Sequence, residues 1–418
     1  MAKRRVVITG MGTVNPLAWD VETYWQRLLA GQSGIASISR FDTTGFDATI
    51  GGEVKADWPG IPEQFVDKRE AKRFDRFAQF AAGAAIQAVA SSGLDFAACD
   101  KDRCGVLIGS GIGGLQELET QHERMLEKGP GRVSPFTVPK LMVNAASANV
   151  AILYGLRGPN SAVATACASA GNSIGDAGRI IQREQADVML AGGSEAALTR
   201  IGLASFCALK ALSTRNDDPT RASRPFDKDR DGFVLAEGAG VVVLEELEHA
   251  RRRGAGILAE LIGYGTNCDA THITAPDAQG RGGIGAIRLA LADAGLQPAQ
   301  VDYINAHGTS TELNDIAETR AIKAVFGRHC YNGLVISSTK SMVGHLLGAS
   351  GGVEIIATVK TLLTGWVHPT INLDQPSDEC DLDYVPHVKR QKDVRIAISN
   401  SFGFGGHNVV LAIKKWEE

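Results

Sequence analysis

The sequence predicts an α/β protein built from two similar halves. Short β-branched runs that end in glycine alternate with longer amphipathic segments, a pattern typical of buried strands connected by helices. The chain has 418 residues, 44% of them hydrophobic, which is sufficient for a sizeable buried core. A similar order of segments then occurs in the second half of the chain, which indicates a duplicated unit.

Strands and helices are expected along the whole chain. The expected strands are 5–10, 104–110, 162–166, 187–192, 239–246, 257–266, 301–306, 334–338, 394–399 and 408–414. The clearest expected helices are 20–30, 73–92, 139–154, 168–183, 280–295, 313–325 and 350–364. The helix at 168–183 carries Gly171, Gly175 and Gly178, and each such glycine costs about 1 kcal/mol relative to alanine. We therefore expect this helix to be packed closely in the centre of the fold.

Four pairs of segments in the same order indicate the repeat. The pairs are 10–13 with 261–266, 108–111 with 305–308, the turn at Cys167 with 335–340, and 240–245 with 408–412. The boundary is expected near 250–256, where a basic run and Gly254 interrupt the pattern. The sequence therefore predicts an N-terminal half, 1–255, and a C-terminal half, 256–418, with reactive groups contributed by both.

Composition excludes several classes of protein. A net charge of −4 argues against a protein that mainly neutralises nucleic-acid phosphates. The apolar run 6–10 is too short for a signal peptide, and no apolar stretch approaches the roughly 20 residues of a membrane helix. The seven cysteines are scattered without metal-ligand spacing, so we expect free thiols and no metal. These features predict a soluble cytoplasmic protein without nucleic-acid or membrane partners.

Cys167 is the first candidate for chemistry. It lies between the expected buried strand 162–166 and the helix 168–183, and free backbone N–H groups and the helix dipole at such a turn would favour the thiolate. His307 and His345 lie in glycine-containing loops of the second half. One thiol and two imidazoles predict an acyl-transfer site. Without the histidines, the favoured interpretation of Cys167 would be one more small buried apolar residue, as most free cysteines are.

Motifs along the whole chain resemble those of the β-ketoacyl-[acyl carrier protein] synthases, in particular the long-chain elongating type II enzymes of bacterial fatty-acid synthesis. The resemblance rests on 7–12, 109–114, 165–169 (Thr-Ala-Cys-Ala-Ser), 211–216, 224–233, 305–311, 338–348 and 400–408. It implies the thiolase fold, in which two duplicated α/β halves form a five-layered α-β-α-β-α arrangement. It also implies a homodimer with one site in each subunit.

The chemistry that the resemblance implies is a decarboxylative Claisen condensation. A long-chain acyl group moves from the phosphopantetheine of acyl carrier protein to Cys167. Malonyl-[acyl carrier protein] then loses CO₂ and attacks the thioester, which gives 3-oxoacyl-[acyl carrier protein] in fatty-acid elongation. No separate cofactor is implied, because the phosphopantetheine arrives on the carrier protein. A ketosynthase of a specialised or polyketide pathway is the alternative that the sequence leaves open.

The resemblance also assigns roles to side chains of the second half. His307 and His345 would donate hydrogen bonds to the malonyl enolate through one ring nitrogen while a backbone donor holds the other. Lys340 would be costly in its apolar loop unless it is paired, and the resemblance pairs it with Glu354 to orient the site. The alternative for Lys340 is a solvated loop residue.

Substrate contacts are assigned in the same way. Phe404, in the glycine-rich segment 402–406, would gate the acyl chain, and its N–H with that of Cys167 would form the oxyanion hole. His407, where many relatives have threonine, receives no catalytic role. The residues that would line the acyl tunnel and the pantetheine channel are Ile112, Phe206, Thr274, Pro276, Thr309, Thr311 and Phe402.

Carrier proteins are strongly acidic, so we expect a basic entrance in spite of the negative net charge. Basic residues gather between 68 and 76, at the start of the expected helix 73–92, and include Arg76. The docking residues implied are Lys68, Arg69, Lys72, Arg73, Arg132 and Lys210.

Other classes fit less well. A non-catalytic chain-length partner would lack the nucleophile. A thiolase-like enzyme would use a second cysteine as its base, and neither Cys268 nor Cys380 lies in such a motif. A cysteine hydrolase would need a base held by a third group, and a zinc site would need a fourth ligand, and the sequence indicates neither.

Overall fold

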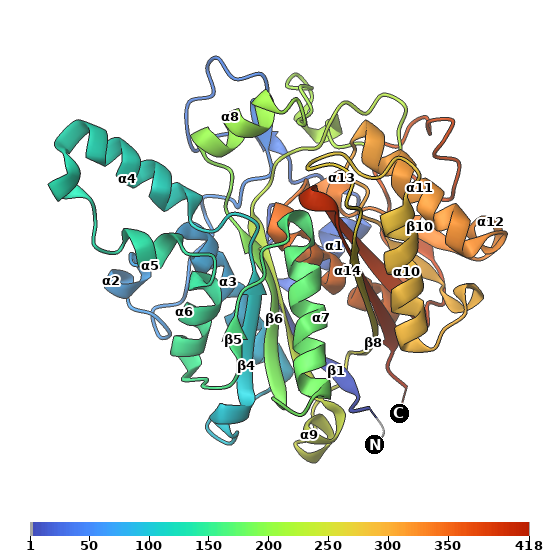
Figure 1. Cartoon of the computed structure of the whole chain (residues 1–418), viewed down its shortest axis with the longest axis horizontal. Helices are drawn as coiled ribbons and strands as arrows, with labels where there is room; N and C mark the ends of the chain where they lie inside the picture. The colour runs from blue at the N-terminus through green and yellow to red at the C-terminus, as the bar shows by residue number, and fades with distance from the viewer. Residues whose placement is uncertain (1–2, 418) are drawn as a thin grey trace.

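The computed structural model describes residues 3–417 and confirms the α/β class. Over these residues a mixed sheet of ten strands runs through the molecule (Figure 1). Its strands are β1 (Val6–Val14), β4 (Cys104–Gly109), β5 (Asn160–Ser161), β6 (Val188–Glu195), β7 (Gly238–Glu246), β8 (Ala259–Cys268), β9 (Tyr303–Asn305), β10 (Val335–Ser337), β13 (Ile396–Gly403) and β14 (His407–Lys415). Short pairs form between β2 (Ala36–Ser37) and β3 (Ile50–Gly51) and between β11 (Trp366–Val367) and β12 (Arg390–Gln391).

The ten-stranded sheet consists of two halves with the same strand order. From the outer edge inward, the first half is β5-β4-β6-β7-β1 and the second is β10-β9-β13-β14-β8. The halves join where β1 pairs with β8 over Val6–Ile8. Strands at equivalent positions are those that the four sequence pairs connect, which confirms the duplicated architecture.

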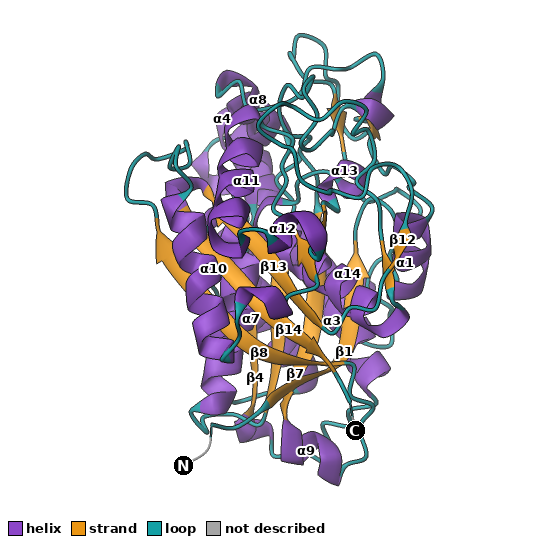
Figure 2. Ribbon diagram, turned by 90° about the vertical axis from the view of Figure 1, so that its right-hand side faces the viewer, coloured by secondary structure: helices purple, strands orange, loops and turns teal. Residues whose placement is uncertain are grey.

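The two halves of the sheet form two layers, and helices form the other three (Figures 1 and 2). Two central helices, α7 (Ser169–Gln182) and α14 (Ser350–Thr364), contact strands of both halves. The first half is covered outside by α3 (Arg76–Ser92) and α6 (Ala145–Tyr154), and the second by α10 (Arg281–Ala294) and α11 (Glu312–Phe326). This is the predicted five-layered arrangement.

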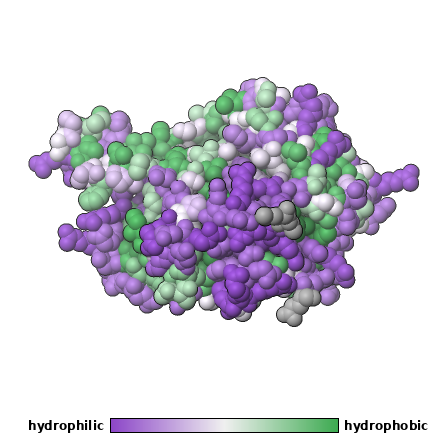
Figure 3. Space-filling view, turned by 60° about the horizontal axis from the view of Figure 1, so that its bottom comes forward, coloured by the Kyte–Doolittle hydropathy of each residue, from purple (hydrophilic) through white to green (hydrophobic). Residues whose placement is uncertain are grey.

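Further helices lie in the connections between these elements. They are α1 (Val21–Leu29), α2 (Lys68–Ala71), α4 (Leu115–Lys128), α5 (Thr137–Leu141), α8 (Arg200–Ala208), α9 (Leu247–Arg252), α12 (His329–Asn332) and α13 (Lys340–Val343). Within residues 3–417, none of the helices has the length and apolar character needed to cross a bilayer. The face at the base of the sheet, near both termini, is mainly hydrophilic (Figure 3).

The central helices pack very closely against the sheet. A Cβ atom on Gly240 of β7 would overlap the peptide of Gly352 on α14. On α7, a Cβ atom on Gly171 would lie 2.9 Å from Val409, and one on Gly178 would lie 2.8 Å from Leu261. These distances are shorter than side chains tolerate, so the predicted close packing of α7 is confirmed.

One expected strand is wrong. Residues 162–165 are not a strand, and β5 ends at Ser161 after pairing only with β4. The reason is its place at the edge of the sheet, where the subunit supplies a partner on one side only. Val163 and Thr165 are half-buried and Ala164 is exposed, so this segment is also not the buried strand that was expected.

Two expected helices have different bounds. The helix expected at 139–154 is divided into α5 and α6, because the carbonyl of Leu141 accepts the N–H of Gly114 at 3.0 Å instead of a helical bond. The helix expected at 73–92 begins at Arg76, because the carboxylate of Asp75 caps it by accepting the N–H of Phe77.

Replacing Gly240 by alanine tests the close approach of β7 and α14. The added Cβ atom has no space against Gly352, and both neighbours are backbone, so we expect Gly240→Ala to lower the free energy of unfolding by about 1–3 kcal/mol or more in urea denaturation. Gly256→Ala is the matched control, since its Cβ would meet no described atom within 4 Å. Equal stability of the two variants would contradict this account.

Candidate active site

Cys167 lies at the turn into α7, as predicted. A short 3₁₀ turn, Ala166–Ala168, precedes the helix, and Ala166 has a φ of 49°, in the left-handed region. The hydroxyl of Ser169 closes the turn by donating to the carbonyl of Ala166 at 2.7 Å and accepting the N–H of Thr165 at 3.0 Å. The turn leaves Cys167 only 7% exposed, at the wall of a cavity.

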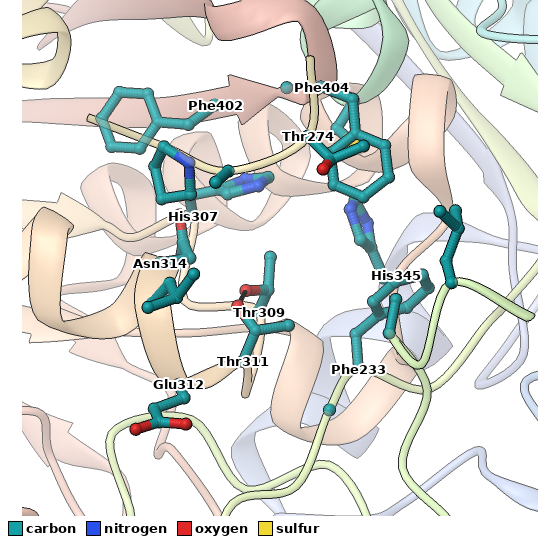
Figure 4. Close-up of a pocket in the computed structure, with 18 of the residues that line it drawn as sticks. Phe233, Thr274, His307, Thr309, Thr311, Glu312, Asn314, His345, Phe402 and Phe404 are labelled. Atoms are coloured by element: carbon teal, nitrogen blue, oxygen red, sulfur yellow. Dashed lines mark hydrogen bonds between the residues drawn. The ribbon is translucent and has the colours of Figure 1, made fainter. Parts of the chain in front are cut away.

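This cavity, of about 360 Å³, brings the thiol and both histidines together. Figure 4 shows the two imidazoles in its wall. His307 follows β9, and His345 follows α13. The centroids of the two imidazole rings are 5.4 Å apart, and the rings are nearly perpendicular at 83°. Because Cys167 precedes α7 of the first half and the histidines belong to the second, groups from both halves meet at this cavity.

Burial dominates the electrostatics of Cys167. It raises the pKa of the thiol to about 11, whereas the ammonium of Lys340 and the N–H of Phe404 act in the opposite direction. The carboxylate of Glu195 adds to the rise. The prediction that the turn makes Cys167 a thiolate is therefore wrong, because desolvation outweighs the backbone donors. The cysteine is a neutral thiol before reaction.

Both imidazoles are neutral as well. Burial lowers the pKa of His307 and of His345 well below the usual value, and the charge of Lys340 lowers both further. Nδ1 of His345 accepts the N–H of Leu347 at 3.2 Å, so the ring proton lies on Nε2. Nδ1 of His307 lies 3.3 Å from Nζ of Lys340, which has no lone pair, so Nε2 again carries the proton. The backbone donor expected for both rings is present at His345, and a lysine replaces it at His307.

Lys340 and Glu354 form a buried ion pair, with side-chain exposures of 1% and 0%. Nζ of Lys340 also donates to the carbonyl of His307 at 2.8 Å. The solvated lysine considered as an alternative is thus excluded. The pair connects the His307 loop to α14, which carries Glu354.

Phe404 brings a backbone donor to the nucleophile. Its N–H acts to lower the pKa of the Cys167 thiol, so it lies close to the sulfur. A Cβ atom on the preceding Gly403 would lie 2.9 Å from the carbonyl oxygen of Thr165, so only glycine permits this approach. Gly405 follows with a φ of 83°. The N–H groups of Cys167 and Phe404 are therefore close to each other at the sulfur.

Most predicted substrate contacts line the cavity. These residues are Phe206, Thr274, Pro276, Thr309, Thr311 and Phe402. The hydroxyls of Thr309 and Thr311 are 2.8 Å apart. Ile112 is not among the lining residues, because the loop after β4 leaves its side chain 38% exposed outside the cavity.

Other lining residues were missed by sequence reasoning. The ring of Phe233 lies 5.2 Å from that of His345, edge to face. Arg230 donates to the carbonyls of Thr311 and Glu312 at 3.0 and 2.9 Å and so holds the threonine loop. Phe233 and Arg230 lie in the motif 224–233, which contributed to the resemblance but suggested no role for them. Further lining residues are Leu209, Asp231, Asp269, Leu313, Asn314 and Asn408.

The predicted docking residues are distributed over several elements. Lys210 lines the cavity, whereas Lys68 and Arg69 lie on the short helix α2, on the flank of the molecule (Figure 1). Lys72 and Arg73 follow α2 and Arg132 ends a 3₁₀ turn, and all three are exposed. Arg76 turns inward to the buried carboxylate of Glu237 at 2.9 Å, so it is structural and does not belong to a docking surface.

Family models match nearly the whole chain. The N-terminal domain of the β-ketoacyl synthases matches residues 3–250 and the C-terminal domain matches 258–374. The chain belongs to the β-ketoacyl synthase family, which makes it a condensing enzyme of the acyltransferase type with the thiolase fold.

Individual relatives cover the full length. A 3-oxoacyl-[acyl-carrier-protein] synthase 2 of Synechocystis sp. is 54% identical over 417 residues, which is 100% of this chain and 99% of the relative. The protein of the same name from Vibrio cholerae is 51% identical over 99% of this chain and 100% of its own length.

Solved structures agree with the fold. A β-ketoacyl synthase from Burkholderia phymatum has a TM-score of 0.90 at 35% identity and covers 99% of this chain and 100% of its own. A ketosynthase from a type II polyketide synthase, solved in complex with its acyl-carrier protein and bound to the hexaketide, has a TM-score of 0.92 at 36% identity, with 100% of both chains covered.

Alkylation by iodoacetamide tests the protonation state of Cys167. Only the thiolate reacts, so with a pKa of about 11 the rate should still be rising at about pH 10. The mass of the Cys167 peptide, followed over time at each pH, gives the rate. The Cys167→Ser variant is the control, because any alkylation that it shows occurs at the other thiols. A rate that levels off near neutral pH would contradict the burial argument.

Proposed function

We propose that this chain is a 3-oxoacyl-[acyl carrier protein] synthase that condenses malonyl-[acyl carrier protein] with a long-chain acyl group held on Cys167 in fatty-acid elongation. The observation that carries the proposal is the cavity in which one thiol and two neutral imidazoles meet. Relatives that bear this name are 50–54% identical over at least 99% of this chain. The ketosynthase of the polyketide system is 36% identical, so elongation of fatty acids is favoured over a polyketide pathway.

The first step is transfer of the acyl group. The sulfur of Cys167 attacks the acyl thioester, and the N–H groups of Cys167 and Phe404 are positioned to stabilise the oxyanion. The pantetheine sulfur leaves and receives the proton of Cys167. The Cys167 thiol thus becomes a thioester, and the pantetheine thioester becomes a thiol. This balance suits a nucleophile that begins as a neutral thiol.

The second step is decarboxylation of the malonyl group. As CO₂ leaves, the electron pair of the broken C–C bond forms an enolate at the thioester carbonyl. The Nε2–H groups of His307 and His345 can donate to that oxygen, and each such donor contributes about 3 kcal/mol to lowering the barrier. The enolate carbon then attacks the acyl thioester, and the Cys167 sulfur leaves as a thiolate and takes up a proton from solvent.

Lys340 supports the histidines electrostatically. Burial is the main reason that both rings remain neutral donors, and the charge of Lys340, held by Glu354, disfavours the imidazolium forms further. Phe402 and the three threonines of the cavity wall, Thr274, Thr309 and Thr311, supply apolar and hydroxyl contacts for the acyl and pantetheine parts of the substrates. We assign these residues to substrate binding, and we keep Ile112 as a contact for the acyl chain beyond this cavity.

Removing one histidine tests the two-step assignment. His345→Ala should slow decarboxylation of malonyl-[acyl carrier protein] about 100-fold or more, because an oxyanion donor is lost. Acyl transfer to Cys167, followed by the mass of its peptide, should slow far less. His122→Ala, which removes an exposed histidine of α4, is the control. Equal losses in the two half-reactions would show that His345 has another role.

The proposed partner is an acyl carrier protein. The exposed residues Arg69 and Lys72, with Lys210 at the cavity, supply positive charge for an acidic partner. The ketosynthase of the polyketide system was solved in complex with such a carrier protein. We retain Lys68, Arg73 and Arg132 as further docking residues; Lys68 already contacts Glu63 at 2.5 Å.

Charge reversal tests the docking surface. Arg69→Glu combined with Lys72→Glu should raise KM for the carrier protein by about tenfold without changing kcat, since rim charges act mainly on association. The effect should fall as salt is added. The matched control reverses Arg251 and Arg252, two exposed arginines of α9. If both double variants have the same KM, the carrier protein docks elsewhere.

We also propose a homodimer. The edge strand β5 is exposed, and Ile152 on the neighbouring α6 is 78% exposed. An unpaired edge beside an apolar side chain is favourable for pairing with a second copy. The mass in solution, measured by sedimentation equilibrium, tests this proposal.

Two organisational proposals complete the assignment. We take 1–255 as the half that carries the nucleophile and 256–418 as the half that carries the two histidines; the family models end at 250 and resume at 258, in support. We propose the cytoplasm as the location, since all seven cysteines are free, as is typical of reducing compartments.

A further inference from the structure

Glu195, the last residue of β6, is fully buried and its carboxylate accepts four hydrogen bonds. Oε1 accepts from the hydroxyl of Ser110 at 2.8 Å and the N–H of Ile112 at 3.2 Å. Oε2 accepts from the N–H groups of Gly111 at 2.7 Å and Gly348 at 3.0 Å. Burial raises the pKa of Glu195, and these four hydrogen bonds act in the opposite direction. A protonated acid would direct its own O–H toward one of these donors, so the ionised form is the one that fits the geometry. Among residues 3–417 no cationic side chain forms a salt bridge with it.

The four donors come from both halves of the protein. Three belong to the loop after β4, and a Cβ atom on Gly111 of that loop would lie 3.5 Å from the carbonyl oxygen of Ala166, in the turn of Cys167. The fourth donor, Gly348, follows Leu347, whose own N–H holds Nδ1 of His345. Two consecutive peptide groups therefore connect His345 and Glu195.

There is no space for side chains between the two loops. A Cβ atom on Gly348 would lie 2.7 Å from Oε2 of Glu195 and would overlap the amide nitrogen of Gly111. The carboxylate is thus the group around which the backbones of the two halves meet, directly beside the nucleophile turn.

We propose that Glu195 is a positioning residue for the condensation: its carboxylate holds the loop 110–112 against the loop 345–348, and so sets Cys167 relative to His345 with a negative charge beside the thiol. This role deepens the proposed function and rests on it for turnover. The effect of the charge on Cys167 is independent of any substrate. It agrees with the contribution of Glu195 to the raised pKa of Cys167.

Two variants separate the effect of the Glu195 charge from the effect of its side-chain length. Glu195→Gln keeps an oxygen for Gly111 and Gly348 but removes the charge, so alkylation of Cys167 by iodoacetamide at about pH 8 should become roughly threefold to tenfold faster, since one pKa unit is tenfold in thiolate. Glu195→Asp keeps the charge but is one methylene shorter. Its kcat for condensation should fall about tenfold or more, with KM for carrier protein within about twofold.

Glu245→Gln is the control for loss of a buried charge. Glu245 is also fully buried and hydrogen-bonded, to Thr9, His249 and Arg253, but it does not contact the cavity. It should leave the alkylation rate of Cys167 unchanged. A role of Glu195 in folding alone would change stability in both glutamine variants and the alkylation rate in neither.

The proposal is overturned if Glu195→Gln alkylates at the wild-type rate, or if Glu195→Asp retains kcat within about twofold. If the aspartate variant does not fold, the alkylation rate of Glu195→Gln decides. If the wild-type protein shows no condensation, the proposed function fails, whereas the alkylation comparison still decides whether Glu195 acts on Cys167.

Discussion

The contact between peptide backbones at the seam of the two halves is the constraint on which the rest of the structure depends. Gly240 of β7 lies against the backbone of Gly352 of α14, and Gly193 of β6 lies against the carbonyl oxygen of Gly348. Backbone atoms cannot yield as flexible side chains do, so the halves fit together in one way. Because the active-site groups are at the ends of these central helices and of the adjoining strands, the same fit places them around one cavity.

The reacting groups of the resulting site carry no net charge before the reaction, and only a few buried charged groups surround them. The thiol is neutral because desolvation outweighs its neighbouring donors, and both imidazoles are neutral because desolvation and the charge of Lys340 act in the same direction. Lys340 and Glu354 neutralise each other, and Lys340 keeps the imidazoles unprotonated. Such a ground state suits this reaction, because the first step only moves the acyl group from one thiol to another. Negative charge develops at the malonyl thioester only as CO₂ leaves. The donors are then already in place for the enolate.

Sequence periodicity was reliable for the central elements and weaker at the periphery. The strands and helices of both halves occur close to their expected positions, since burial imposes a strong pattern on them. The segment 162–166 has the composition of a buried strand, yet it lies at an edge that the subunit does not cover. The break between α5 and α6 depends on a hydrogen bond from the N–H of Gly114 to the carbonyl of Leu141. These residues are far apart in the sequence, so no local pattern indicates the bond.

The sequence by itself determined the family, the duplicated fold and the identity of Cys167, His307 and His345, because motifs and periodicity are local properties of the chain. Only the tertiary structure decided the protonation of Cys167, the lysine partner of His307 and the place of Glu195 between two loops. These depend on burial and on distances between residues remote in sequence. Desolvation in particular has no local signature, because it is produced by every layer that covers the site.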